Sequence, residues 1–343
     1  MARVIFGLVG VLVIGAAIYA GLLEIGAFDI SRADLEAKYT TPDSKFAEVD
    51  GVRIHYMDQG PRDAEALVLV HASYMSLRSF DAIAPLLAKN FRVVRFDLPN
   101  AGLSGPDPQN RYSIELNMEV LDQLTRDLGI DKFALFGTSS GGPVAFRYAA
   151  EHPDRVTRLI LINSAGMPRT AATNPNRQRV SDLQLWINRR HESMAYWTEG
   201  LSTNFTSMAP PHDLIEMVYD MNRIEGHRDV AAAFMRNFKT GDPQEMLGRV
   251  TMPTLIGWGI KNPTVMHLEA DVMSLWLTSA PSKVIKYPDV AHYLYIEIPD
   301  KVAADMTAFL KGEMDGELRV TKRVPMADIA AVDALESSES APQ

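Results

Sequence analysis

The sequence predicts an α/β fold, in which a mainly parallel sheet is covered by helices on both faces. Two observations predict it. Compact apolar runs of strand length alternate with segments of helical spacing, and a long stretch without strand signals separates two such alternating regions. Buried parallel strands read as continuous apolar runs and are joined by helical crossovers, so the pattern indicates repeated βα units with a helical insertion.

The first alternating region begins with a different signal. Residues 46–60, FAEVDGVRIHYMDQG, contain two alternating segments around Asp50-Gly51, which indicates a β-hairpin. Apolar strands and helices then follow in turn as far as residue 163. Strands are expected at 66–71, 91–97, 132–137 and 158–163, and helices at 80–89, 113–129 and 142–153.

A helical insertion then interrupts the strands. SDLQLWINRRHESMAYW and DLIEMVYDM have helical spacing, and Met and Trp are frequent. Strands resume at 254–259 and 283–288, with helices over 269–277 and 299–310. The chain therefore divides into an N-terminal apolar segment, a linker, a first core part, the insertion, a second core part and a mostly disordered acidic tail: 1–24, 25–45, 46–167, 168–250, 251–312 and 313–343.

The N-terminal segment is apolar over 4–23 and contains no charge. A helix of about 20 residues spans roughly 30 Å, enough to cross a bilayer core. Arg3 precedes it, and Glu24 and Asp29 follow, which favours a membrane anchor with the folded domain on the non-cytoplasmic side. A signal peptide cleaved near residues 15–17, which would release a secreted protein, and a buried globular helix are the alternatives.

Composition excludes several classes of protein. The formal net charge is -9, so no nucleic-acid partner is expected. Cysteine is absent, which excludes disulfides, thiol nucleophiles and thiolate metal sites. The eight histidines form no spacing typical of a metal centre, so neither a metal nor another cofactor is expected.

A nucleophile candidate lies between an expected strand and an expected helix. Gly137-Thr-Ser139-Ser-Gly141 is a G-x-S-x-G pattern, whose sharp turn exposes the central hydroxyl while small neighbours avoid collision. The next residue, Ser140, offers its backbone N–H at a helix N-terminus, where negative charge is favoured. The alternative is an ordinary glycine-rich turn or a phosphate cradle.

Several further segments accompany this turn, and over residues 46–311 the chain resembles cap-bearing serine hydrolases of the α/β-hydrolase superfamily. The resemblance implies an eight-stranded, mostly parallel sheet with a helical cap inserted after the sixth strand, and the N-terminal segment fits membrane-anchored members. The segments that carry the resemblance, besides the turn, are LVLVHAS (67–73), FDLPNAGLSGPDP (96–108), AEHPDRV (150–156), LINSAGMP (161–168), PTLIGWG (253–259) and AHYLYIEIP (291–299).

The resemblance also implies a base and an oxyanion hole. His292, in an Ala-His step after the last strand, is the general base, which a serine hydroxyl needs for activation. The backbone N–H groups of Ser73 and Ser140 are the oxyanion donors, and His71 holds the loop of Ser73. This chain has His71-Ala72 where the family usually has His-Gly. Because alanine disfavours positive φ, a shifted loop is expected.

The acid that normally orients the base is missing from both familiar positions. The family usually carries it three residues beyond the glycine that here is Gly259, where this chain has Asn262, and some relatives carry it near Asn163. An amide oxygen can orient a histidine but supplies no charge.

Three interpretations remain open at this point. The first is a working hydrolase whose acid is Asp289, Glu269 or Asp271. The second is a slower hydrolase that uses Asn262 to orient His292, and the third is a binding or structural protein on a hydrolase scaffold.

The substrate class follows from the nucleophile and the cap. A serine at position 139 excludes relatives with an aspartate nucleophile. The resemblance then implies serine chemistry on esters, lactones, thioesters or C–C bonds beside a carbonyl. Among the large cap residues, Trp186, Trp197 and Met217 are expected either to pack in the core or to line an adaptable apolar pocket. A small hydrophobic acyl substrate is therefore expected. A membrane, to which the N-terminal helix would attach the protein, is the other expected partner.

Overall fold

The computed structural model describes residues 2–168 and 193–320. Its sheet has eight strands in the order β1-β2-β4-β3-β5-β6-β7-β8. β2 runs antiparallel to β1 and β4, and the other neighbours are parallel, which confirms the predicted sheet. The strands are β1 (Lys45–Val49), β2 (Val52–Gln59), β3 (Ala66–Val70), β4 (Arg92–Phe96), β5 (Phe133–Thr138), β6 (Val156–Ile162), β7 (Thr254–Gly259) and β8 (Ser282–Tyr287).

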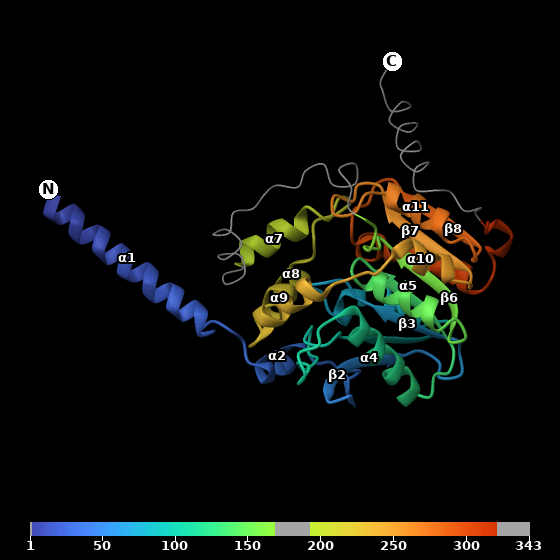
Figure 1. Cartoon of the computed structure of the whole chain (residues 1–343), viewed down its shortest axis with the longest axis horizontal. Coiled ribbons are helices and arrows are strands. Elements are labelled where there is room, and N and C mark those ends of the chain that lie inside the picture. Colours follow the sequence, from blue (N-terminus) through green and yellow to red (C-terminus); the bar gives the residue numbers. More distant parts are fainter. Residues whose placement is uncertain (1, 169–192, 321–343) are drawn as a thin grey trace, which may run out of the picture.

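Helices cover both faces of this sheet (Figure 1). Within the described residues they are α1 (Ala2–Glu24), α2 (Arg32–Tyr39), α3 (Ala84–Leu87), α4 (Ile114–Asp127), α5 (Gly141–Glu151), α7 (Met194–Ser202), α8 (His212–Met221), α9 (His227–Asn237), α10 (Pro243–Arg249), α11 (Leu268–Trp276), α12 (Leu294–Glu297) and α13 (Pro299–Leu310), with short 3₁₀ turns η1 (Leu77–Phe80) and η2 (Asp315–Glu317).

The two faces of the sheet build two separate cores. Along β3, Val68 and Val70 pack with residues of α4, α5, α10 and α11. The alternate residues Leu67 and Leu69 pack with residues of η1, α3, α12 and α13, together with α7 and α8. Because successive side chains of a strand point to opposite faces, a strand buried on both faces must be apolar throughout, as β3 is.

The local predictions differ in accuracy. The hairpin is confirmed, with Asp50 and Gly51 at φ 48° and 79° between β1 and β2. The helix expected over 80–89 is only partly present, as η1 and the four-residue α3. Pro85 lies at the start of α3, where its missing N–H and its ring prevent a helix from running through it.

The helical insertion lies between β6 and β7 in the chain, where α7, α8, α9 and α10 occur. Part of the predicted segment SDLQLWINRRHESMAYW falls outside the described residues. The insertion is tied to the linker region through α8, because Asp220 accepts hydrogen bonds from Lys38 Nζ and Tyr39 Oη, both at 2.7 Å. Part of the predicted tail also makes contacts, since Arg319 pairs with Ser282 of β8.

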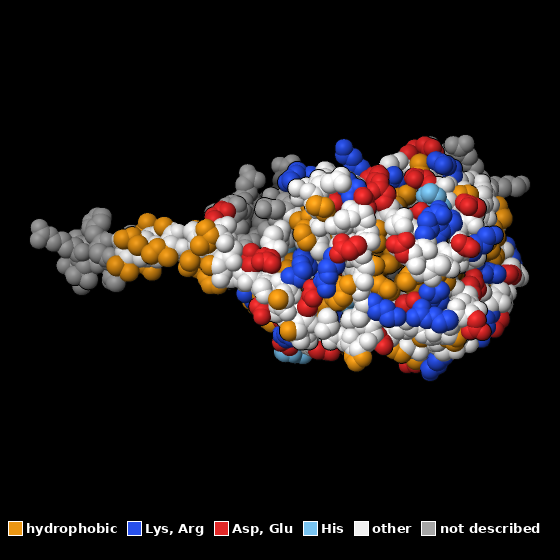
Figure 2. Space-filling view, turned by 90° about the horizontal axis from the view of Figure 1, so that it is seen from below, with side chains coloured by type: hydrophobic (Ala, Val, Ile, Leu, Met, Phe, Trp, Pro, Cys, Tyr) orange, Lys and Arg blue, Asp and Glu red, His pale blue; other side chains and the backbone are white. Residues whose placement is uncertain are grey.

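The N-terminal segment forms α1, which projects away from the body of the molecule (Figure 1). Figure 2 shows apolar side chains along this projection, and Val11, Leu12 and Ile14 are each more than 60% exposed. Among the described residues, however, no helix is both long and apolar enough to cross a membrane. The membrane anchor stays a prediction.

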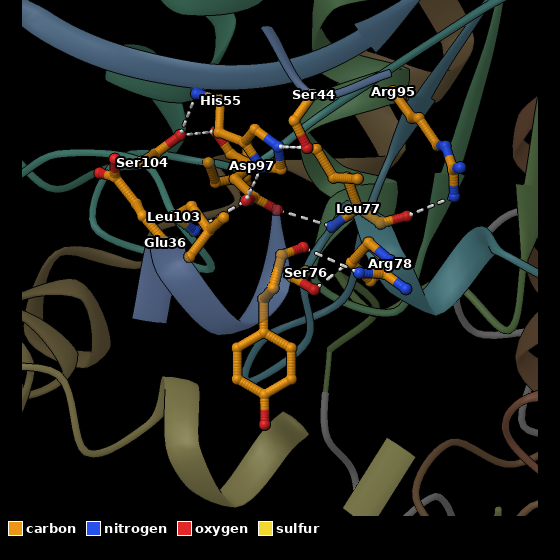
Figure 3. A network of polar contacts seen from close by, with 12 residues as sticks. Glu36, Ser44, His55, Ser76, Leu77, Arg78, Arg95, Asp97, Leu103 and Ser104 are labelled. Atoms are coloured by element: carbon orange, nitrogen blue, oxygen red, sulfur yellow. Dashed lines mark hydrogen bonds and ion pairs between the residues drawn. The ribbon is translucent and has the colours of Figure 1, made fainter. Parts of the chain in front are cut away.

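The loop after β4 is held by a buried carboxylate (Figure 3). Asp97 Oδ1 accepts the backbone N–H of Leu77 at 2.7 Å, and Oδ2 accepts that of Leu103 at 2.8 Å. Oδ2 also lies 2.7 Å from His55 Nδ1, and Ser44 Oγ lies 2.9 Å from His55 Nε2. Burial by itself raises the pKa of Asp97, but the hydrogen bond and charge of His55, with the backbone donors, lower it overall.

Ser44, His55 and Asp97 thus repeat the residue types of a catalytic triad, but their surroundings are structural. His55 and Asp97 are completely buried, so a substrate cannot reach the His55 imidazole, which lies between Ser44 and Asp97. The Ser44 hydroxyl also accepts the backbone N–H of Thr41 at 3.0 Å. The carboxylate therefore fixes the loop that begins at Leu98, and this loop reaches the candidate site described below.

Asp97→Asn is expected to destabilise the protein by about 3–5 kcal/mol, because an amide cannot accept all three donors and leaves buried groups unpaired. Urea unfolding followed by circular dichroism measures this change. Asp43→Asn, at an exposed carboxylate, is the matched control and should change stability by less than about 0.5 kcal/mol. Equal effects of the two substitutions would contradict the anchoring role of Asp97.

Candidate active site

Ser139 lies at the sharp turn between β5 and α5. Its φ is 49°, in the left-handed region that costs non-glycine residues energy and that a nucleophile turn requires. The flanking glycines are needed for close packing. A Cβ at Gly137 would lie 2.5 Å from the carbonyl oxygen of Gly141, and one at Gly141 would lie 2.6 Å from that of Val70. The G-x-S-x-G pattern therefore has the strained geometry that its spacing predicts.

His292 lies after β8 and contacts the residue expected at the acid position. Its Nδ1 is 3.1 Å from Asn262 Oδ1. The same oxygen accepts the backbone N–H groups of Thr264 at 2.9 Å and Val265 at 3.2 Å. Reversing the amide would direct its NH₂ group at two N–H donors, so these contacts fix the oxygen toward the ring. His292 Nδ1 must then carry the proton, which leaves Nε2 unprotonated.

The surroundings of His292 contain no charged partner among the described residues. Burial lowers the pKa of His292 to about 4, and no carboxylate raises it. Two of the proposed replacement acids lie elsewhere, since Asp271 pairs with Lys286 at 2.5 Å and Asp289 is exposed to solvent. His292 Nδ1 therefore faces the Asn262 oxygen and neither Asp271 nor Asp289.

The insertion contacts the loop that carries His292. The backbone N–H of His292 donates to the carbonyl of Asn204 at 3.1 Å. The imidazole packs edge-on against Tyr293, whose ring in turn lies 5.5 Å from that of Phe205. Between the described residues Ser139 and His292 there is no direct hydrogen bond, so His292 contacts Asn262 but not the predicted nucleophile.

The two predicted oxyanion residues contact each other. The Ser73 backbone N–H donates to Ser140 Oγ at 2.6 Å, and the Ser73 hydroxyl donates to the same oxygen at 2.7 Å. The expected difficulty at Ala72 is absent, because the positive φ of this loop falls on Tyr74, at 65°. The Ser73 donor is therefore present but is occupied by the neighbouring hydroxyl.

His71 holds this loop as expected. Its Nδ1 lies 2.8 Å from the carbonyl oxygen of Ala72, and its Nε2 accepts the backbone N–H of Leu98 at 3.0 Å. The first contact requires a proton on Nδ1 and the second requires none on Nε2, so the ring is neutral. Burial lowers the pKa of His71, which stabilises this neutral form.

Asn163, at the alternative acid position, connects loops instead of facing the His292 ring. Its Nδ2 donates to the carbonyls of Ala291 at 3.1 Å and His292 at 2.7 Å. Its Oδ1 accepts the backbone N–H of Gly259 at 3.0 Å. The amide therefore joins the loop of the base to the end of β7, a role that needs both a donor and an acceptor.

Glu297 is a second positioning residue that sequence reasoning did not identify. Its Oε1 accepts the backbone N–H of Ala291 at 2.8 Å. Its Oε2 accepts the backbone N–H groups of Thr206 and Ser207 at 2.8 and 2.7 Å. This carboxylate joins the His292 loop to the insertion, and its oxygens are engaged there. Its only signal in the sequence is its place in the segment AHYLYIEIP, five positions after the histidine.

The three residues predicted to line a pocket in the insertion do not lie together in the described structure. Trp186 lies outside the described residues. Trp197 is buried, with its ring 5.5 Å from that of Tyr74. Met217 is buried and lines a different cavity, together with Tyr39. A cavity that does adjoin the predicted oxyanion residues is lined by Ser73, Ser140, Leu98, Asn100, Asn117, His227, Val230 and Phe234, among others.

Comparison with known proteins gives the family. An uncharacterized hydrolase of Saccharomyces cerevisiae is 32% identical over 114 residues, only 33% of this chain and 39% of that protein. A 2-hydroxy-6-oxononadienedioate/2-hydroxy-6-oxononatrienedioate hydrolase of Klebsiella pneumoniae subsp. pneumoniae is 26% identical and covers 75% of this chain and 92% of that protein.

A crystal structure of a membrane phospholipase A has the same fold. It aligns with a TM-score of 0.65 at 24% identity, covering 91% of this chain and 99% of that chain. The family model described as alpha/beta hydrolase fold matches residues 65–299, which include Ser139, Asn262 and His292. This protein therefore belongs to the α/β-hydrolase family.

Proposed function

We propose that this α/β hydrolase is a serine hydrolase of carboxylic esters that uses Ser139 as nucleophile, His292 as base and Asn262 in place of the usual acid. One observation carries the proposal. The Asn262 oxygen, held by two backbone donors, accepts from His292 Nδ1 and selects the tautomer that a general base needs.

The reaction follows from these roles. His292 Nε2 accepts the Ser139 proton while Oγ attacks the ester carbonyl, and the oxygen that becomes negative is stabilised by the backbone N–H groups of Ser140 and Ser73. The imidazolium then protonates the departing alcohol, which leaves an acyl-Ser139 ester. A water molecule, deprotonated by His292, attacks this ester and releases the carboxylic acid, and Ser139 regains its proton.

The neutral amide predicts slow turnover. During the attack His292 becomes a buried cation, and Asn262 offers only a dipole where an aspartate would offer a charge. In the serine-protease template the change from Asp to Asn lowers kcat by roughly 10⁴. Residual catalysis of roughly 10³ over water can remain from the oxyanion hole and binding.

Two measurements test the proposal on the purified chain. A fluorophosphonate should label a single serine, which peptide mass spectrometry should assign to Ser139, and nitrophenyl acetate should be hydrolysed above background. Labelling at another serine would reject the assignment of the nucleophile.

A second candidate function is binding without turnover. Two observations favour binding without turnover. The Ser73 backbone N–H is already occupied, and the described side chains of Ser139 and His292 form no hydrogen bond with each other. In that case fluorophosphonate labelling and ester turnover would both be absent, and the hydrolase proposal would be wrong.

Ser140→Ala is expected to raise kcat on nitrophenyl acetate about two- to tenfold. The substitution removes the hydroxyl that occupies Ser73 N–H, so this donor no longer has to exchange one hydrogen bond for another. Steady-state kinetics measure the change, and Ser140→Thr, which keeps a hydroxyl, is the control. A slower Ser140→Ala enzyme would show that the hydroxyl assists the reaction instead of blocking the donor.

A further inference from the structure

The cavity beside Ser140 has a defined size and position. It is bounded by the Ser73 loop, the loop after β4, the start of α4 and one side of α9. Its volume is about 80 Å³. An engineered protein cavity of about 150 Å³ accommodates benzene, so this cavity fits a group smaller than benzene. Leu98, Val230 and Phe234 supply apolar walls.

Polar side chains with unused hydrogen-bonding capacity line the same cavity. Asn117 on α4 is only 4% exposed, and its amide makes no hydrogen bond to any described residue. Asn100 is 3% exposed, and its Nδ2 likewise lacks a partner in the described part of the chain. Buried amides normally have hydrogen-bond partners, so the unpaired Asn100 Nδ2 beside the Asn117 amide indicates a polar atom of a ligand.

The charge of that ligand atom is restricted. The described lining contains no Lys, Arg, Asp or Glu. Arg32 contacts Asn100 but does not line the cavity. Its guanidinium donates to the carbonyls of Leu103 and Ser104 and, at 3.5 Å, to Asn100 Oδ1. Burial lowers the pKa of His227, which favours its neutral form. Among the described lining residues a carboxylate or ammonium group would therefore find no counter-charge, whereas a hydroxyl could pair with an amide.

The sheet order indicates which part of an ester the cavity receives. His292 and Asn262 follow β8 and β7, on one side of β5 and Ser139, whereas the cavity loop follows β4 on the other side. Since His292 must protonate the departing alcohol, the alcohol lies toward β7 and β8. The acyl group then extends in the opposite direction, toward the cavity.

We infer that this cavity is the acyl-binding subsite and that it selects short acyl groups carrying an uncharged hydroxyl, which pairs with the Asn117 amide. The inference rests on the proposed esterase function and adds its substrate class. It distinguishes this chain from an enzyme for dicarboxylate substrates and from one for long, unsubstituted acyl chains.

Three nitrophenyl esters test the inference, because they differ only in the acyl group: β-hydroxybutyrate, isovalerate, in which a methyl replaces the hydroxyl, and succinate, which is charged. We expect kcat/KM for β-hydroxybutyrate to exceed that for isovalerate about fivefold or more, and succinate to be the poorest. Asn117→Leu should abolish or reverse the first preference. Gln123→Leu, on the exposed face of α4, should retain it.

The ratio of kcat/KM values from one preparation does not depend on the fraction of folded enzyme, so a loss of stability in Asn117→Leu does not affect the result. If the wild-type chain favours isovalerate or succinate, or if Asn117→Leu keeps the hydroxyl preference, the subsite is wrong. Failure of the proposed function is recognised separately, as the absence of both Ser139 labelling and turnover of all three esters.

Discussion

Ser139→Ala is expected to abolish fluorophosphonate labelling and to lower nitrophenyl acetate turnover about a hundredfold, to the residual rate that the oxyanion hole and binding support. The expected loss is large because the hydroxyl forms the covalent intermediate, for which no neighbouring group can substitute. Steady-state kinetics and labelling with mass spectrometry measure it. Ser139 lies at φ 49°, where alanine is also strained, so circular dichroism should verify that the variant is folded.

The control for this prediction is Ser279→Ala, which removes an exposed hydroxyl far along the chain. It should retain full labelling and turnover. If Ser139→Ala keeps its activity, hydrolysis arises from another group.

Asn262→Asp is expected to raise kcat about a hundredfold or more, toward the roughly 10⁴ that separates Asp from Asn in the serine-protease template. The geometry for a carboxylate already exists, since the position offers His292 Nδ1 and the backbone N–H groups of Thr264 and Val265. The new charge would stabilise the His292 imidazolium in a buried site, where charges interact strongly. Nitrophenyl acetate kinetics measure the gain.

Asn163→Asp provides the same chemical change at the other familiar acid position. It should reduce activity, because Asn163 donates to two backbone carbonyls and a carboxylate would repel them. A gain for Asn163→Asp together with no gain for Asn262→Asp would mean that Asn163 holds the acid position, contrary to the contacts in the structure.

Much of the fold could be predicted because its signals are local. β3 is a continuous apolar run and β5 is apolar from Phe133 to Phe136, as strands buried on both faces must be, and Asp50-Gly51 adopts the positive φ values of a tight hairpin. The G-x-S-x-G turn is also a local signal, since its glycines are required by the close backbone approach around Ser139.

The parts that could not be predicted depend on contacts between distant segments. Ser73 and Ser140 are separated by 67 positions, so nothing in the sequence indicates that one hydroxyl occupies the donor of the other. The loop-joining roles of Asn163 and Glu297 likewise depend on carbonyl and N–H groups that the fold brings close. Asn117 looks like an ordinary helical residue until α9 and the loop after β4 enclose it.

The central claim is that a neutral amide holds a neutral, buried base, and the pH dependence of kcat/KM tests it most directly. His292 must be unprotonated to act, so activity disappears as the pH falls through its pKa. With Asn262 the loss should occur near pH 4, and with Asn262→Asp it should move up toward the ordinary histidine value of 6.5 or beyond. A wild-type loss near pH 6.5 that Asn262→Asp leaves unchanged would contradict the claim.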